Sequence, residues 1–267
     1  MKMIIMKKNI WLICLVVFLF VPEVSSGEQI SIIYDSETRP GSKMKPGWGF
    51  SAIIERGDFV VMLDTGLDEE TFKHNLRISG YKPTDIDVVA ISHWHPDHTG
   101  GLRYLMEANP NLIAYVPAST AHQPPVDKRY IVLKGKKDLP HGLLVLQTTA
   151  VDSEKSGVED ELSVVVKTAK GPAVVHGCAH SELRDILKNV KKVFPGKIHM
   201  SMGGMRYLNK TEEEMRVITK DLKEIGLEKI GPAHCAVGPA STKIFNESFG
   251  KHVFYARLGA VIPLPPE

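Results

Sequence analysis

Short apolar runs alternate with amphipathic segments along most of the chain, beginning near residue 29. Runs rich in Val, Ile and Phe, bounded by Gly, Pro and Asp, are typical of strands, and Arg56-Gly57-Asp58 between two such runs predicts a tight hairpin. The predicted strands are Ile30–Tyr34, Phe50–Glu55, Phe59–Leu63, Asp87–Ser92, Leu112–Val116, Leu143–Thr148, Leu162–Thr168, Ala173–His176 and a short strand that ends at Ile230.

Helices are predicted between these strands from apolar spacing and from end signals. Asp68 is a good N-cap for a helix that runs to Ser79 and stops at Gly80. A second helix follows Gly100-Gly101 as far as Asn109, a third is capped by Ser181 and reaches about Lys192, and a fourth begins with the capping box of Thr211 and Glu214 and ends before Gly226. Without an internal repeat or a compositional break, the pattern indicates one compact α/β domain over residues 27–267.

The first 26 residues have a different pattern. Lys2, Lys7 and Lys8 precede an apolar run from Ile10 to Val21, and Pro22 and small residues follow it. This run is shorter than the roughly 20 residues that a membrane-spanning helix needs. We therefore interpret residues 1–26 as a secretory signal peptide rather than a membrane anchor or a core helix, and we expect an exported, periplasmic or secreted mature chain without a stable membrane span.

Composition and charge narrow the range of functions. The chain is 43% hydrophobic and 24% charged, as in ordinary globular proteins, and removal of residues 1–26 leaves equal numbers of basic and acidic side chains. A neutral chain does not favour nucleic acid or an anionic membrane as partner, so we expect a small-molecule substrate. In an oxidising compartment, the remaining cysteines, Cys178 and Cys235, must be paired, buried or bound to metal.

The segment His93-Trp94-His95-Pro96-Asp97-His98-Thr99-Gly100-Gly101 carries the strongest chemical signal. Pro96 disfavours a helical backbone at His95, which predicts an extended loop at the end of a strand. In an extended chain His93, His95 and Asp97 point to one side and His98 points to the other. His93 and His95 are then expected to bind one cation, while Asp97 and His98 reach a second cation about 3.5–4 Å away.

Two later segments offer further ligands at the ends of predicted strands. Cys178 and His180 follow Ala173–His176, and His234 with Cys235 follows the strand that ends at Ile230. Because ligands in α/β sheets gather beyond strand ends, these side chains are expected to converge on the first cluster. Imidazole and carboxylate ligands, with a thiolate added, suit zinc best, and iron or manganese are the alternatives.

The motif His93-x-His95-x-Asp97-His98-x-Gly100-Gly101, preceded by Leu63-Asp64-Thr65-Gly66, resembles the signature of the metallo-β-lactamase superfamily. Further segments, which are Asp160–Ser163, Gly177–His180, Gly203-Gly204 and His234-Cys235, are similar to its dihydropterin-methyl-ribofuranosylaminobenzene phosphate synthase-like branch. The resemblance implies an αββα sandwich, in which two mixed β-sheets lie face to face between flanking helices and a metal site lies along one edge. In many members a metal-bound hydroxide attacks an ester, an amide or a phosphoester.

On this interpretation each candidate residue has a role. His93, His95 and His180 hold the first metal; Asp97, His98 and His234 hold the second, and Asp97 also orients the attacking water. Asp64 accepts the other ring N–H of a ligand histidine. Many members place an Asp where this chain has Cys178, so either Cys178 or Glu161 completes the second site.

Two further positions depart from the branch and concern the substrate. Arg206 stands where Gly-Gly-x-His is common, and a guanidinium there suits a carboxylate or phosphate, unless it is only a surface residue. Trp48 replaces a common His, at the end of the Pro/Gly loop Arg39–Trp48, which we interpret either as a flap over the substrate or as a solvated connector.

The function expected from these residues is metal-assisted hydrolysis of a small molecule by an exported, zinc-dependent dinuclear enzyme. No Gly-x-Ser-x-Gly motif is present, which argues against a serine hydrolase with that nucleophile turn. The alternatives are an iron-containing oxidoreductase and a noncatalytic metal-binding or sensing member of the same fold.

Overall fold

The computed structural model describes residues 28–150 and 153–267, and it contains two mixed β-sheets. The expected signal peptide lies outside the described residues. The N-terminal sheet has the strand order β13-β1-β2-β3-β4-β5-β6, and the C-terminal sheet has the order β12-β11-β10-β9-β8-β7. The strands are β1 (Gln29–Tyr34), β2 (Ser51–Arg56), β3 (Phe59–Leu63), β4 (Val88–Ala90), β5 (Ile113–Val116), β6 (Tyr130–Val132), β7 (Lys136–Asp138), β8 (Leu143–Thr149), β9 (Asp160–Val166), β10 (Ala173–His176), β11 (Ile198–Gly203), β12 (Leu227–Pro232) and β13 (Val261–Pro263).

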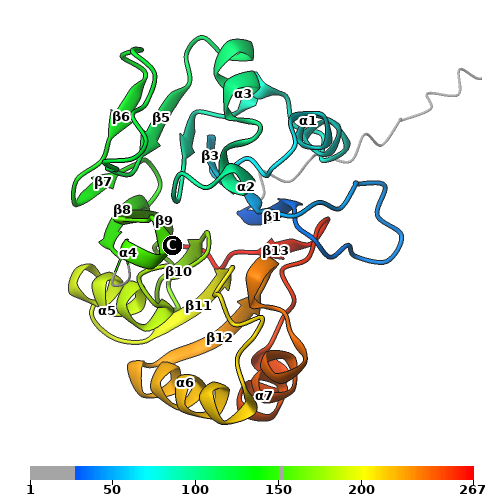
Figure 1. The fold of residues 1–267 in the computed structure, drawn as a ribbon, viewed down its shortest axis with the longest axis vertical. Helices are drawn as coiled ribbons and strands as arrows, with labels where there is room; N and C mark the ends of the chain where they lie inside the picture. The colour runs from blue at the N-terminus through cyan, green and yellow to red at the C-terminus, as the bar shows by residue number, and fades with distance from the viewer. Residues whose placement is uncertain (1–27, 151–152) are drawn as a thin grey trace, which may run out of the picture.

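The sheets pack face to face with helices outside them (Figure 1). One apolar cluster, which includes Ile32, Leu63 and Val164, fills the space between the sheets. Two further clusters lie between each sheet and its outer helices. The helices are α1 (Glu69–Ile78), α2 (Pro96–Thr99), α3 (Leu102–Ala108), α4 (Ser153–Ser156), α5 (Leu183–Val193), α6 (Glu212–Ile225) and α7 (Pro239–Phe249), with short 3₁₀ turns at Pro83–Asp85, His234–Ala236 and Gly250–His252. The fold is the αββα sandwich of two mixed sheets that the sequence predicted.

The structure confirms several of the residues that were predicted to cap helices or to form turns. The Asp68 side chain accepts a hydrogen bond from the Thr71 amide at the start of α1, and Thr211 and Glu214 form the predicted capping box of α6. Gly57 has a φ of 61° in the β2–β3 hairpin, a backbone conformation that glycine adopts at little cost.

Two local predictions are wrong. Ser181 does not cap α5, because its amide and hydroxyl both donate to the buried Glu161 carboxylate, and Glu182 takes the N-cap position. The chain after His95 is not extended, because Pro96 fits the first position of a helix and starts the short helix α2. His95 itself is extended, with φ −66° and ψ 145°, as Pro96 requires.

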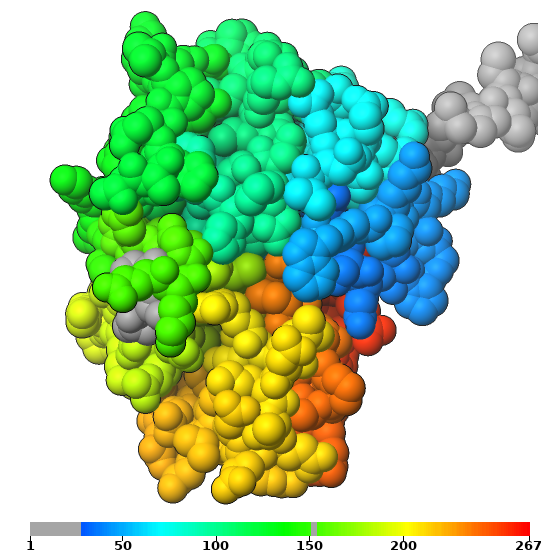
Figure 2. Space-filling view, viewed as in Figure 1, coloured from blue at the N-terminus to red at the C-terminus, as the bar shows by residue number. Residues whose placement is uncertain are grey.

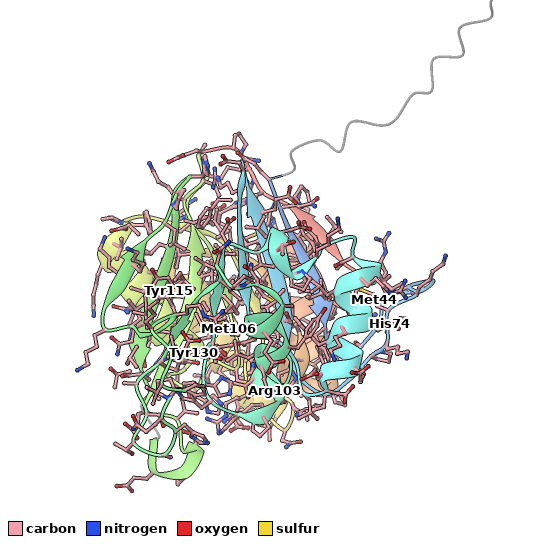
Figure 3. All side chains as sticks on the ribbon, turned by 90° about the horizontal axis from the view of Figure 1, so that it is seen from above. Met44, His74, Arg103, Met106, Tyr115 and Tyr130 are labelled. Atoms are coloured by element: carbon pink, nitrogen blue, oxygen red, sulfur yellow. The ribbon has the colours of Figure 1, made fainter. Side chains whose placement is uncertain are left out.

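The Arg39–Trp48 loop is tied to α1. Asn75 accepts a hydrogen bond from the Lys45 amide at 2.8 Å and donates one to the Lys45 carbonyl at 2.9 Å. Figure 3 shows Met44 of this loop beside His74 of α1, whose Nε2 lies 3.0 Å from the Lys43 carbonyl oxygen. The middle of the loop is therefore held against the helix, and Trp48 lies at its far end.

Candidate metal centre

The candidate ligands meet where the ends of strands from both sheets face one another. His93, Asp97 and His98 follow β4, while Cys178 and His180 follow β10 and His234 follows β12. The ring nitrogens, the carboxylate oxygen and the cysteine sulfurs form overlapping groups whose ligand atoms lie within 4.8 Å of one another. These groups are His93, His95 and His180; Asp97, His98 and His234; His93, His98 and Cys178; and Cys178, His234 and Cys235.

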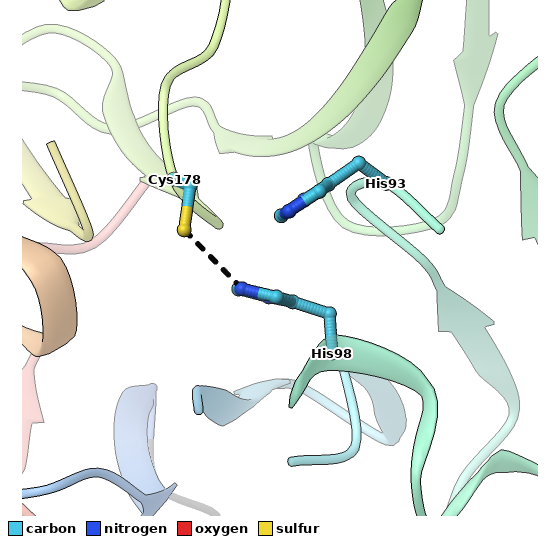
Figure 4. A group of neighbouring side chains, drawn as sticks. All are labelled: His93, His98 and Cys178. Carbon is cyan, nitrogen blue, oxygen red and sulfur yellow. Dashed lines mark hydrogen bonds between the residues drawn. The ribbon is translucent and has the colours of Figure 1, made fainter. Parts of the chain in front are cut away.

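The structure thus brings together all of the predicted metal ligands, in the two sets that the sequence suggested. Cys178 adjoins both sets, and its Sγ lies 3.3 Å from His98 Nε2, with His93 alongside (Figure 4). Figure 2 shows the N-terminal part of the described chain, coloured cyan to green, in contact with the C-terminal part, coloured yellow to orange, across the middle of the molecule.

Glu161, the other candidate for the second site, is used differently. Its buried carboxylate accepts hydrogen bonds from the amides of His180 and Ser181 and from the Ser181 hydroxyl. Burial raises the pKa of Glu161, and these donors oppose that rise. Glu161 therefore holds the turn that presents His180, and it is absent from the ligand groups of the described residues.

Asp64 organises the first segment. Its Oδ1 accepts a hydrogen bond from the Ser92 amide, and its Oδ2 accepts from Ser92 Oγ and from His98 Nδ1, each at 2.6 Å. A side chain at Gly177 would collide with Ser92 Oγ, so the approach of β10 to this pair requires glycine. Asp64 lies where the sequence placed it, against the ring of a candidate ligand.

These contacts determine which ring nitrogens carry a free lone pair. His98 Nδ1 donates to the carboxylate of Asp64, which leaves Nε2 free. Ser92 Oγ gives its proton to Asp64, so it accepts from His93 Nδ1 at 2.9 Å and leaves His93 Nε2 free. The Ser156 carbonyl oxygen accepts from His95 Nε2 at 3.0 Å, which leaves His95 Nδ1 free.

The two free nitrogens of His93 and His95 face one another. His93 Nε2 lies 3.1 Å from His95 Nδ1, and neither carries a hydrogen in the arrangement above. Two lone pairs at this distance repel unless a positive charge lies between them. The buried Nδ1 atoms of His180 and His234 also lack a hydrogen-bond partner, so the donor set fits a cation.

Electrostatics favour neutral imidazoles at His93 and His180. Burial, followed by the neighbouring imidazoles, lowers the pKa of His93 well below its usual value. Burial and then the charge of Arg206 lower the pKa of His180 to about 3. Neutral imidazole is the form that binds a metal.

The second set is different, because it contains negative charge. Burial alone would lower the pKa of His98, but the charge of Asp64 outweighs it and the pKa is raised. Burial opposes ionisation of Asp97, yet its hydrogen bond to His234 and the nearby His98 lower its pKa to about 2. Asp97 Oδ2 lies 3.3 Å from His234 Nε2 and 3.7 Å from His98 Nε2, so an ionised carboxylate joins these rings.

Strained backbone is concentrated here. Apart from His141, the described non-glycine residues with positive φ are Asp64, Ala179, Glu182, Arg206 and His234, all at or beside the centre. His234 has a φ of 48°, and its amide donates to the buried Asp35 carboxylate at 2.8 Å. Burial raises the pKa of Asp35 to about 7.

The two predicted substrate residues flank the ligands. The Trp48 ring lies 4.6 Å from the His234 ring and is 48% exposed. Arg206 is exposed, and its charge is felt at His180. The cavity that touches His93 and His95 has a volume of only about 10 Å³, whereas the cavities of about 610 Å³ lie away from the ligands. We place the chemistry at the ligands, because the metal-binding side chains gather there and none of them lines the two larger cavities.

Some supporting residues escaped prediction. Ser92, Asp35 and Ser156 hold ligand histidines by contacts that no local pattern signals. Of these three residues, only Ser92 could have been suspected from the sequence. It directly precedes His93, so its hydroxyl lies between a buried strand and the loop that carries the ligands.

The fold and the ligand geometry define the class of protein. The family model of the metallo-beta-lactamase superfamily matches residues 45–187, and the chain belongs to this superfamily. Solved structures agree on the fold: a metal-dependent hydrolase of the beta-lactamase superfamily aligns with a TM-score of 0.70 at 24% identity, over 89% of this chain and 99% of that one. The human tRNase Z short form aligns with a TM-score of 0.54 at 14% identity, over 89% and 99%.

Curated relatives include a synthase. The chain is 24% identical over 246 residues to 7,8-dihydropterin-6-methyl-4-(beta-D-ribofuranosyl)-aminobenzene-5'-phosphate synthase of Methanocaldococcus jannaschii, which covers 76% of this chain and 83% of that protein. A thioesterase of Emericella nidulans is 29% identical over 97 residues, or 35% of this chain and 28% of that protein. Across the residues that the structure describes, none of the helices has the length and apolar character of a membrane span.

Proposed function

We propose that this protein is a metal-dependent hydrolase that cleaves an ester, an amide or lactam, or a phosphoester in a small molecule. The observation that carries this proposal is the pair of acceptor nitrogens on His93 and His95, 3.1 Å apart, beside a second set of ligands that includes an ionised Asp97. Two adjacent cation positions are the arrangement used for hydrolytic displacement.

The residues have separate tasks in this proposal. His93, His95 and His180 hold the first cation, and Asp97, His98 and His234 hold the second, with two zinc ions per chain proposed and iron or manganese as alternatives. When bound, the cations lower the pKa of a water molecule to about 7 and polarise the scissile oxygen. Asp97, whose carboxylate lies beside His98 and His234, orients that water, and Asp64 fixes the ring of His98.

The substrate is proposed to lie over the centre, between Trp48 and Arg206. Trp48 offers an exposed aromatic face next to His234, which suits a planar group. Arg206 offers an exposed cation whose charge acts on His180, and it suits a carboxylate or phosphate. Both residues act on binding rather than on bond cleavage.

The test is hydrolysis by the metal-loaded protein of aryl phosphodiester, phosphomonoester, lactone and β-lactam substrates. His95→Ala should reduce turnover to background, while the matched control His141→Ala should not, because His141 is exposed and contacts Asp58 away from the centre. Full metal occupancy with no turnover of any substrate would contradict the proposal and favour the sensing or redox alternatives.

The synthase relative supports a second candidate, a reaction that joins two small molecules at the same centre. Its specific support is that the alignment covers 83% of the synthase. Incubation with a ribofuranosylaminobenzene phosphate and a dihydropterin that carries a leaving group on its 6-methyl carbon, followed by mass spectrometry for the coupled product and the released group, tests it. A coupled product together with no hydrolysis would replace the first proposal by this one.

We also propose that the mature protein is exported, on the basis of the charged and apolar pattern of residues 1–26. Mass spectrometry of the protein from fractionated cells should find an N-terminus near Gly27 outside the cytoplasm. An intact N-terminus in the cytoplasmic fraction would contradict export.

A further inference from the structure

A cavity of about 470 Å³ lies against α1, and none of the candidate metal ligands lines it. The Arg39–Trp48 loop, α1, the turn that follows α1 and Tyr104 of α3 all contribute to its lining. In Figure 3, His74, which lines the cavity from α1, lies beside Met44 of the loop. The volume is in the range of sites that bind small molecules.

The lining of this cavity carries an excess of positive charge. Four cations and one carboxylate line it, and these are Lys45, Lys73, Arg77, Lys82 and Glu70. The ammonium group of Lys73 lies 2.9 Å from the carboxylate of Glu70. Among the described residues, no carboxylate oxygen lies within 4.0 Å of the charged nitrogens of Lys45, Arg77 or Lys82. Like charges around one cavity repel one another, and a bound anion removes that repulsion.

The backbone that carries these three cations is fixed. Asn75 of α1 forms hydrogen bonds with the amide and the carbonyl of Lys45, and the Lys82 amide donates to the Asp85 carboxylate at 2.8 Å. Arg77 lies in the last turn of α1. A ligand therefore has to order only side chains when it binds, which lowers the entropic cost of binding.

The walls of the cavity are partly aromatic and apolar. The Tyr81 hydroxyl donates to the Glu55 carboxylate at 2.6 Å, which holds the Tyr81 ring in place. The Tyr104 ring lies under the ammonium group of Lys73, 4.7 Å from the ring centroid. Leu76, which is buried, adds apolar surface. These walls suit a planar or apolar group that is attached to the anion.

A second cavity with several lysines provides a comparison. Lys136, Lys188 and Lys192 line this cavity, which is formed by β7, β8 and α5. Lys136 lies 2.8 Å from the Asp138 carboxylate, and Lys188 lies 3.3 Å from that of Asp185. Most of the positive charge there is balanced within the chain, so the cavity on α1 is the better site for an anion.

We propose that the cavity on α1 binds a small organic molecule that carries a phosphate group. A phosphate monoester carries about two negative charges at pH 7, so it balances three cations better than a carboxylate does. The Arg77 guanidinium can donate two parallel N–H groups to phosphate oxygens, while Lys45 and Lys82 add point charges. The organic part lies against Tyr81 and Tyr104. This site goes beyond the proposed hydrolysis and does not rest on it.

Phenylphosphonate is a suitable probe, because it has no ester bond for the proposed hydrolase to cleave. Titration of the cation-loaded protein should shift the amide signals of residues 74–82 in two-dimensional NMR in a saturable way. Combining Arg77→Gln with Lys82→Gln should weaken the binding seen at these signals about tenfold or more, because charge-assisted hydrogen bonds are lost. Both side chains are exposed, so the variant should fold, and circular dichroism checks this.

The matched control combines Lys188→Gln with Lys192→Gln, which removes the same charge from the second cavity and should change the affinity by less than about twofold. Inorganic phosphate should bind more weakly than phenylphosphonate, because it does not reach the aromatic walls. The inference is overturned by the absence of a saturable shift, by an unchanged affinity in the Arg77 and Lys82 variant, by an equal loss in the control, or by equal affinities for the two probes. These signals do not depend on turnover, so a failure of the proposed hydrolysis leaves them unchanged.

Discussion

The histidines from the two halves of the chain are held in different ways. In the N-terminal half, each ring of His93, His95 and His98 uses one nitrogen in a hydrogen bond, to Ser92, Ser156 and Asp64 respectively. In the C-terminal half, His180 and His234 are held by their backbone amides, which donate to Glu161 and Asp35, and their ring Nδ1 atoms have no partner.

This difference indicates that the two groups of histidines contribute differently to folding and to metal binding. The N-terminal rings are oriented before any cation arrives, because protein groups fix them. The C-terminal rings lie on backbone that the fold fixes, but their buried Nδ1 atoms have no hydrogen-bond partner among the described residues, so we expect these rings to be held less firmly without a cation. We therefore expect the N-terminal contacts to contribute to folding without metal, and the C-terminal histidines to contribute mainly through metal.

The largest effect is expected from Asp64→Ala. It removes the acceptor for two groups of Ser92 and for His98, all buried. Breaking a buried charge pair typically costs about 3–5 kcal/mol. Urea denaturation of the metal-free variant measures this loss, and a variant as stable as the parent would remove the basis for N-terminal preorganisation.

Metal removal is expected to have the next largest effect. A cation at 100 times its dissociation constant stabilises the native state by about 2.7 kcal/mol. For a protein of this size each kcal/mol shifts the melting temperature by about 2–4 °C, so chelation should lower it by about 5–10 °C. Calorimetry with and without chelator tests this, and an unchanged melting temperature would show that the C-terminal histidines need no cation.

The comparison is sharpest between His98→Ala and His234→Ala in the metal-free protein. Both remove a buried imidazole of the same size, but the His98 ring donates to the fully buried Asp64 at 2.6 Å, whereas the His234 ring lies 3.3 Å from the partly exposed Asp97. Hydrogen bonds to charged groups contribute about 1.5–3 kcal/mol, so His98→Ala should be less stable by about 2 kcal/mol. Equal free energies of unfolding for the two variants would mean that the two halves of the chain hold their histidine rings equally firmly without metal.

The smallest effect is expected from a substitution that changes only the binding of the substrate. Arg206→Gln should raise KM for a phosphate or carboxylate substrate about tenfold, which corresponds to 1.4 kcal/mol, and leave kcat nearly unchanged. The change should be absent for a neutral substrate. A fall in kcat with unchanged KM would instead place Arg206 at the reacting atoms.

Much of the fold was predictable, since strands and helices with clear apolar spacing and caps were found. The strands β6, β7, β11 and β13 and the helices α4 and α7 were missed. β11 is buried throughout but contains His199 and Ser201, which hide the apolar run, and α7 is largely polar with Pro239 at its start. β7 is exposed and carries charged residues, so its strand pairing has no local signal.

The ligand set was predictable because its members sit in short motifs at strand ends. The mixed roles of the carboxylates were not predictable, because Glu161 and Asp35 act through backbone amides that only the folded chain brings near. The contact of Cys178 with Cys235 joins the ends of β10 and β12 across the intervening strand β11, and nothing local to either cysteine encodes it.

The central claim is that the centre holds two cations, one in each ligand set. Elemental analysis of the reloaded parent protein together with His180→Ala and His234→Ala tests it most directly. The account predicts two equivalents in the parent protein and one in each variant, with each variant keeping the cation of the other set. One equivalent in the parent, or two in both variants, would contradict it.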